Sequence, residues 1–283
     1  MKAFASLFTL ILGFFCFCQP NTEVYLFDLI KSESGQYNIT NPVNISDNVG
    51  YDNQPSFWPD GNSIIYARTV DGQTDIARYY IGSGKTKLIT NTPQGSEYSP
   101  TPTPDGKISS IRLDTTGLQL LYKYDLSGNS EVLVDELVIG YHTWLGKSRL
   151  AAFILGEPNT LHIVDVKKGK NKKVAENIGR SLHKIPGFGN LSFLDKSKDQ
   201  WVIKGMDPRK ESIVEISIAL EGAEDYCWTP SGELLMGKDS KIWIRKGYEG
   251  WEELFDIQNY GLNGITRMTV SPDGNMIAMV LSK

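Results

Sequence analysis

The sequence is poor in the residues that most often bind metals or attack substrates. Its 283 residues include three histidines and three cysteines. Neither His-x-x-x-His nor Cys-x-x-Cys occurs, so the common spacings of zinc ligands are absent. The Gly-x-Ser-x-Gly pentapeptide of α/β-hydrolases is absent as well. We therefore expect no bound metal, no cofactor and no serine-hydrolase active site.

The chain also lacks a strong excess of charge of either sign. It has 29 basic and 33 acidic residues, and its formal net charge is −4 at pH 7. Such a chain has no global field that would attract nucleic acid or anionic lipid. The one basic cluster, at residues 167–173, contains glycine and asparagine and is typical of a solvated hairpin turn. We expect no nucleic-acid partner.

Long apolar runs are absent except at the N-terminus. Lys2 is followed by an apolar run from Ala3 to Phe17, which is short for a membrane span and typical of a secretory signal. We predict that residues 1–18 form a signal peptide cleaved after Cys18. The mature protein would then be periplasmic or secreted and would have no transmembrane span.

The cysteines leave lipidation as an alternative for the N-terminal segment, and they exclude a disulfide within the mature chain. Lipidation of Cys16 or Cys18 would give a lipoprotein, but the bulky Phe15 and Phe17 precede these cysteines. Cleavage after residue 18 leaves Cys227 as a single cysteine, which cannot form an internal disulfide. We interpret it as a small buried side chain.

A repeated turn motif is the clearest positive signal in the sequence. It reads Trp-Pro-Asp-Gly at residues 58–61, and its copies place glycines at positions 61, 106, 146, 187, 232 and 274, which are 45, 40, 41, 45 and 42 residues apart. The copies at 146 and 187 have lost the Pro-Asp-Gly sequence. A period of about 40–50 residues is typical of β-propellers, in which each repeat forms one four-stranded blade. The sequence therefore predicts an all-β, six-bladed propeller.

The last repeat predicts how the ring closes. It contains two strand-like segments, at residues 267–270 and 276–281, whereas the N-terminal part offers two more at 24–29 and 40–45. We predict that the N-terminal strands complete the last blade, because closure removes the exposed edges of an open array. Residues 19–283 would then form a single propeller domain.

One repeat carries a resemblance to a known family. Residues 54–90 run from Gln-Pro-Ser-Phe-Trp-Pro-Asp-Gly through an Asp-Ile strand to a closing Leu-Ile-Thr, and they resemble a full repeat of TolB-like propellers. Residues 98–106 and 268–274 restart the pattern. The resemblance implies a periplasmic propeller that binds a protein partner and is used here alone. Similar repeats also occur in the propellers of prolyl-oligopeptidase-like enzymes.

Candidate binding residues lie at the start of each predicted innermost strand, where the loops of several blades meet at the channel mouth. They combine carboxylates, arginines, histidines and tyrosines, a mixture that suits a peptide or protein tail. His142 and His183 are assigned the same repeat position, from which they could face a ligand together. The full set is Tyr51, Asp52, Glu97, Tyr98, Tyr141, His142, Arg180, His183, Asp225, Tyr226 and Arg267.

These features favour a monomeric, non-catalytic protein that binds an envelope protein or peptide at the channel mouth. One alternative is a small propeller enzyme, lactonase-like or glycoside-hydrolase-like, with a carboxylate, histidine or metal cluster at the same mouth. Another is a structural module that positions other envelope proteins. The fold class leaves these alternatives open, because one scaffold hosts many activities.

Overall fold

Each repeat glycine lies in a tight turn between the two strands nearest the channel. In the first repeat the Trp58 amide donates to the Ser63 carbonyl at 2.8 Å, and the Gly61 amide donates to the Trp58 carbonyl at 2.9 Å. The φ of Gly61 is 73°, in the left-handed region that glycine adopts without a steric penalty. The eroded turns keep the closing bond, since the Leu145 amide donates to the carbonyl of Arg149 at 2.9 Å.

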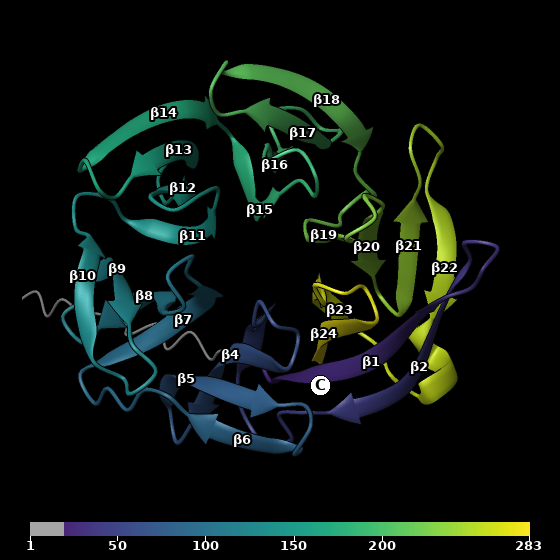
Figure 1. Ribbon diagram of the computed structural model, residues 1–283, viewed down its shortest axis with the longest axis horizontal. Helices are drawn as coiled ribbons and strands as arrows, with labels where there is room; N and C mark the ends of the chain where they lie inside the picture. Colours follow the sequence, from purple (N-terminus) through teal and green to yellow (C-terminus); the bar gives the residue numbers. More distant parts are fainter. Residues whose placement is uncertain (1–19) are drawn as a thin grey trace, which may run out of the picture.

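The computed structural model describes residues 20–283, which form six antiparallel sheets of four strands around a central axis (Figure 1). The predicted signal peptide, with Cys16 and Cys18, lies outside the described residues. From the channel outward, blades one to three consist of β3 (Asp52–Phe57), β4 (Ser63–Val70), β5 (Gln73–Tyr80) and β6 (Lys85–Leu88); β7 (Gly95–Pro102), β8 (Ile108–Asp114), β9 (Gln119–Tyr124) and β10 (Ser130–Val134); β11 (Ile139–Trp144), β12 (Arg149–Ile154), β13 (Thr160–Asp165) and β14 (Lys170–Glu176).

Blades four and five continue in the same order, and the short 3-10 helix η1 (Ile257–Tyr260) leads from blade five into blade six. Within residues 20–283, no helix is long and apolar enough to span a bilayer. Blade four comprises β15 (Ile178–Lys184), β16 (Leu191–Asp195), β17 (Val202–Asp207) and β18 (Ser212–Ile218). Blade five comprises β19 (Tyr226–Trp228), β20 (Leu234–Lys238), β21 (Lys241–Arg245) and β22 (Glu252–Asp256). Blade six comprises β23 (Ile265–Val270), β24 (Met276–Ser282), β1 (Thr22–Lys31) and β2 (Tyr37–Asn44).

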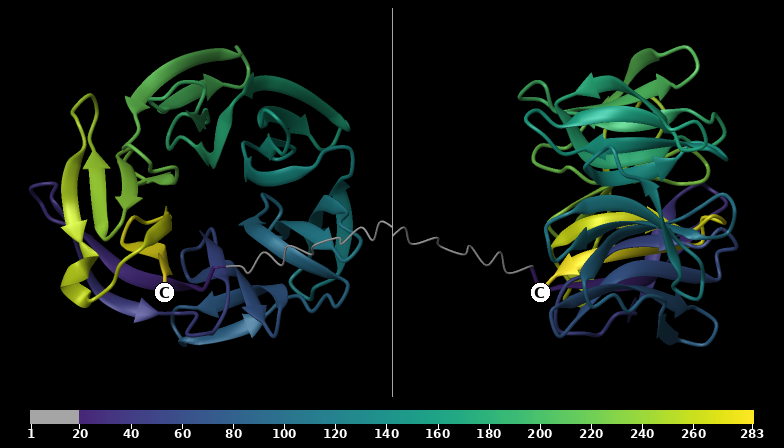
Figure 2. Two further views of the ribbon diagram at one scale, coloured as in Figure 1. Left: turned by 180° about the vertical axis from the view of Figure 1, so that it is seen from behind. Right: turned by 90° about the vertical axis from the view of Figure 1, so that its left-hand side faces the viewer.

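Blade six joins the two ends of the described chain, which confirms the predicted closure (Figures 1 and 2). β1 pairs antiparallel with β24, so that Val24 lies opposite Val280, and β2 pairs with the outer edge of β1. The Lys283 amide also donates to the Asn21 carbonyl at 3.0 Å. The ring is therefore fastened by strand pairing between segments that are about 250 residues apart in the chain.

The hydrophobic core lies between neighbouring blades. In β4 the residues Ile64, Ile65, Tyr66 and Ala67 are all fully buried. Ile64 and Tyr66 pack with Val24 and Val280 of blade six, whereas Ile65 packs toward blade two. A strand covered on both faces needs a continuous apolar run, which explains the imperfect alternation of this segment.

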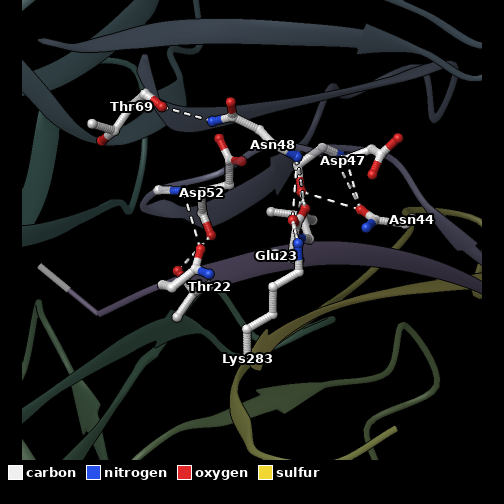
Figure 3. A network of polar contacts seen from close by, with 12 residues as sticks. Thr22, Glu23, Asn44, Asp47, Asn48, Asp52, Thr69 and Lys283 are labelled. Carbon is white, nitrogen blue, oxygen red and sulfur yellow. Dashed lines mark hydrogen bonds and ion pairs between the residues drawn. The ribbon is translucent and has the colours of Figure 1, made fainter. Parts of the chain in front are cut away.

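A polar network fastens the closure from the side (Figure 3). The carboxylate of Glu23, on β1, is fully buried, and it accepts hydrogen bonds from Lys283 and from Ser46. The amide of Asn48 donates to it at 3.2 Å. Burial by itself would raise the pKa of Glu23, but these donors outweigh burial and hold the pKa below its usual value.

Asp52 joins the same network only through its backbone carbonyl, which accepts from Thr22 Oγ1 at 3.0 Å (Figure 3). Its carboxylate, unlike that of Glu23, is not surrounded by donors. It is fully buried at the start of β3, and neither of its carboxylate oxygens has a hydrogen-bond partner. Burial raises the pKa of Asp52 to about 6, and the positive charge of Arg68 only partly opposes the shift. Asp52 therefore holds a proton more tightly in the folded than in the unfolded chain.

We predict that Asp52→Asn stabilises the protein at pH 8 and has little effect at pH 4. With the folded pKa above the unfolded value of about 4, the contribution of Asp52 to stability is fully present below about pH 4 and is lost as pH rises through about 6. A shift of about two pKa units corresponds to at most about 3 kcal/mol. Urea unfolding of both proteins at the two pH values measures the difference, and an equal difference at both would contradict the raised pKa.

Glu23→Gln should have the opposite effect at pH 7. Removing a buried charge that accepts three hydrogen bonds should lower the free energy of unfolding by about 1–3 kcal/mol. Glu253→Gln is the matched control, because Glu253 pairs with Lys241 at an exposed position, where an ion pair contributes little. The same urea titrations measure both, and comparable losses in the two variants would refute a special role for the closure network.

Candidate functional site

One residue from each of the six blades, at the same offset from the blade's inner turn, lines the channel. We call the residue whose amide closes the inner turn of each blade the turn-closing residue; these are residues 58, 103, 145, 185, 229 and 271. The channel-lining residue lies four positions before each of them. All six residues line the same cavity, which has a volume of about 180 Å³. We call them the channel ring: Gln54, Ser99, Tyr141, Ser181, Asp225 and Arg267.

Asp225 is the negative centre of the channel ring. Arg180 binds it through Nε, at 3.2 Å to either oxygen, and through Nη2. Ser181 Oγ donates to Asp225 at 3.1 Å, and Nη1 of Arg267 lies 3.7 Å from the carboxylate. Burial would raise the pKa of Asp225, but the two arginines outweigh it and hold the pKa below its usual value. The carboxylate is thus charged and fully engaged.

Arg267 reaches across the channel. Its Nη2 donates to the hydroxyl of Tyr141 at 3.1 Å, and its guanidinium lies over the tyrosine ring at 5.0 Å from the centroid. Arg267 belongs to β23 of blade six and Tyr141 to β11 of blade three, which face each other across the ring in Figure 1. This contact forms a bar across the channel.

The two channel histidines do not occupy the same repeat position, and the sequence alignment was wrong here. His142 lies three residues before its turn-closing residue, whereas His183 lies two residues before Ile185. Because side chains alternate along a strand, the two point toward different neighbours. His142 Nε2 lies 2.7 Å from Ser109 Oγ of blade two, while the ring of His183 lies 4.8 Å from that of Tyr226 in blade five.

Both histidines are neutral at physiological pH. Burial lowers the pKa of His142 to about 4. Burial also lowers the pKa of His183 to about 4, against the opposing charge of Asp225. Neither ring is therefore poised to exchange a proton near pH 7.

Two buried polar atoms on the wall formed by blades two and three have no partner. Nδ1 of His142 and Oγ of Ser99 make no hydrogen bond within the described residues. His142 is 7% exposed and Ser99 is 8% exposed, and both line the channel cavity. Unsatisfied buried polar atoms are costly, so a wall that carries two of them suits a polar ligand.

The tyrosines of the candidate set have different roles. Tyr51 and Tyr98 are not among the residues that line the cavity, and their rings meet edge to face with centroids 6.3 Å apart. Burial raises the pKa of Tyr51 to about 12, although the charge of Arg267 opposes the shift. Tyr226 is buried between blades and donates to Ser192 Oγ at 3.0 Å.

Asp52 and Glu97 are not among the residues that line the cavity. Both are fully buried at equivalent positions of β3 and β7, where they lie opposite Arg68 and Arg112. Burial raises the pKa of Glu97 to about 7, although Tyr124 donates a hydrogen bond to it at 3.0 Å. These two carboxylates therefore lie behind the channel wall. Seven residues of the candidate set do line the cavity: Tyr141, His142, Arg180, His183, Asp225, Tyr226 and Arg267.

The sequence reading missed the smaller members of the channel ring. Gln54 accepts a hydrogen bond from the Ser99 amide at 2.7 Å, and both residues have a positive φ, of 57° and 53°. Each directly precedes a proline of the repeat, at residues 55 and 100, and this shared position could have identified them. Ser181 is not followed by a proline, and only its hydrogen bond to Asp225 in the structure identifies it as a member of the ring.

A second concavity, of about 620 Å³, lies between blades four and five, toward the turn side of the ring. It is lined partly by Trp228 and by two strongly exposed aromatic residues, Phe188 and Tyr248. Phe188 lies in the eroded turn of the fourth repeat, where an aromatic residue at a turn could have indicated a surface feature.

The fold is shared with proteins of different function. No protein-family model and no curated protein match the sequence. Among solved structures, the chain is similar to a putative TolB from Agrobacterium tumefaciens, with a TM-score of 0.72, 14% identity and coverage of 94% of this chain and 99% of that chain. It is also similar to TolB from Acinetobacter baumannii, with a TM-score of 0.58, 13% identity and coverage of 92% and 64%.

A gluconolactonase from Xanthomonas campestris has a TM-score of 0.64 at 8% identity, with coverage of 94% of this chain and 96% of that chain. Identities this low show the fold alone. The protein is thus a six-bladed β-propeller with structural similarity to the TolB propeller, and a lactonase has the same architecture.

The channel charges predict a strong effect of Asp225→Asn on stability. This change leaves two partly buried guanidinium groups without their counter-charge, and breaking such a pair costs about 3–5 kcal/mol. Glu211→Gln, which removes the partner of the exposed Lys172, should change stability by less than about 1 kcal/mol. Thermal unfolding of the two variants compares these effects, and similar melting temperatures would contradict the role assigned to Asp225.

Proposed function

We propose that this propeller is a non-catalytic binding protein of the periplasm or the cell exterior, which holds a protein or peptide partner at its channel mouth. The predicted export signal and the resemblance of the repeats to TolB-like propellers support a role in organising the cell envelope. The observation that carries the proposal is the chemistry of the channel ring.

Among the described residues, the channel lining offers charge and hydrogen bonds, while its two histidines and its carboxylate are not poised for proton transfer near pH 7. A general acid or base works best with a pKa near the working pH. His142 and His183 titrate far below neutrality, and Asp225 is held ionised by two arginines. Glu97, whose pKa is raised to about 7, lies outside the cavity lining. This combination supports binding in preference to acid–base catalysis.

Metal-assisted catalysis has no evident ligand set in the part of the chain that the structure describes. Within residues 20–283, no three His, Cys, Asp or Glu side chains are grouped so that they could hold a metal ion. The alternative of a lactonase-like enzyme is therefore supported by the shared fold alone.

The surface around the channel mouth has the mixed charge that suits a polypeptide. A neighbouring cavity of about 330 Å³ extends from Arg180, Asp225 and Arg267 to the exposed Lys238 and Asp239 at the β20–β21 turn of blade five. A peptide carries both charge signs and backbone polar groups, so it can complement such a surface.

Site-specific photo-crosslinking tests the proposal. A photoreactive amino acid at Lys238 should give a discrete adduct with an envelope protein in intact cells. The same amino acid at Asp60, in the exposed turn at the other end of β3, serves as the control and should give none. Equal labelling from both positions, or no adduct from Lys238, would count against a partner at the channel mouth.

A further inference from the structure

The channel cavity carries one positive charge in excess. Its ionised lining residues are Arg180, Arg267 and Asp225, whereas its two histidines are neutral at pH 7. Within the cavity lining, two guanidinium groups thus share a single carboxylate. The nearby Glu224 accepts from the Arg180 amide at 2.9 Å, but its charge is paired with Lys196. One further negative charge would bring the site to neutrality, and a carboxylate matches the fork of donors on a guanidinium.

The two arginines are not equally engaged by Asp225. Arg180 makes three hydrogen bonds to the carboxylate, through Nε and Nη2. Arg267 lies 3.7 Å from it, beyond a normal hydrogen bond, and Nη2 of Arg267 donates instead to the hydroxyl of Tyr141. Arg267 is therefore the group with charge and donors to offer a ligand, and its side chain is 15% exposed.

The bar between Arg267 and Tyr141 favours binding of the end of a partner polypeptide over binding of an internal segment. Because the bar spans the channel, a polypeptide cannot thread past it without breaking the hydrogen bond, whereas a chain end can stop against it. The cavity volume of about 180 Å³ is below the range of roughly 300–1,000 Å³ that is usual for pockets of drug-sized ligands. A single terminal residue fits this limit better than a folded segment.

The opposite wall of the cavity can form hydrogen bonds with the other polar groups of a terminal residue. Ser99 Oγ and His142 Nδ1 have no partner and line the same cavity. A terminal residue carries polar backbone groups besides its carboxylate, and these are suited to the unsatisfied atoms of a serine and a neutral histidine. The site thus combines a cationic side with a neutral polar side.

We infer that the channel binds the C-terminal carboxylate of its partner polypeptide, with Arg267 as the principal anchor and Arg180 as the second cation. The inference rests on the proposed function and specifies which part of the partner enters the channel. Binding consists of a charge-assisted hydrogen-bond pair and needs no covalent step.

Two short peptides test the inference directly. N-acetyl-trialanine with a free carboxylate and its C-terminal amide differ only in the terminal charge. At pH 7 and low salt, calorimetric titration should show that the acid binds at least about tenfold more tightly than the amide. Arg267→Gln should abolish this preference. Arg209→Gln, at an exposed position away from the channel cavity, should retain it.

A second variant guards against misfolding of Arg267→Gln. Arg267→Lys keeps a positive charge at this position, so it should fold as the unaltered protein does and retain part of the acid preference that Arg267→Gln loses. Equal binding of acid and amide, or an acid preference that survives Arg267→Gln, would overturn the inference. So would binding of gluconate without binding of the peptide acid, because the carboxylate would then belong to a small sugar acid. A crosslink at Lys238 that persists alongside equal peptide binding would leave the proposed function standing and remove only the carboxylate assignment.

Discussion

Antiparallel pairing between β1 and β24 is the constraint on which the rest of the molecule depends. It converts a row of six sheets into a ring, and only a ring can bring β11 and β23 face to face across a channel. Without the pairing, both terminal sheets would present unpaired edges. The buried Glu23, which binds Lys283 near the C-terminus, fastens the junction with a charge that is satisfied only when both chain segments are in place.

The buried carboxylates show how strongly the environment decides the state of one chemical group. Glu23 and Asp225 are surrounded by donors and stay ionised, so their pKa values fall. The donors and positive charges near Asp52 and Glu97 do not offset burial, so their pKa values rise to about 6 and about 7. The carboxylates also differ in location. Asp52 and Glu97, whose pKa values are raised, lie behind the channel wall, whereas Asp225 lines the channel and binds Arg180 and Ser181.

The charged groups of the channel are fixed by one another. Its arginines and its carboxylate hold one another in fixed positions, and its histidines remain neutral because the surrounding blades exclude water. Such preorganised charge favours recognition of a complementary group, since little reorganisation is needed on binding. The β-propeller fold is shared with TolB proteins and with a gluconolactonase, so the fold by itself does not decide the function.

The sequence by itself determined the fold class, the number of blades and the closure of the ring. Turn glycines and strand periodicity are local signals, and the missing half of the last repeat could be matched to the N-terminal segment by counting. Only the tertiary structure decided which candidate residues meet. The bulges between Asn53 and Ser56 and between Tyr98 and Thr101 shift the register within each blade, so spacing along the chain did not reveal that Asp52 and Glu97 are buried behind the wall. The contact between Tyr141 and Arg267 joins residues 126 positions apart, and it follows from the curvature of the ring, which no local pattern records.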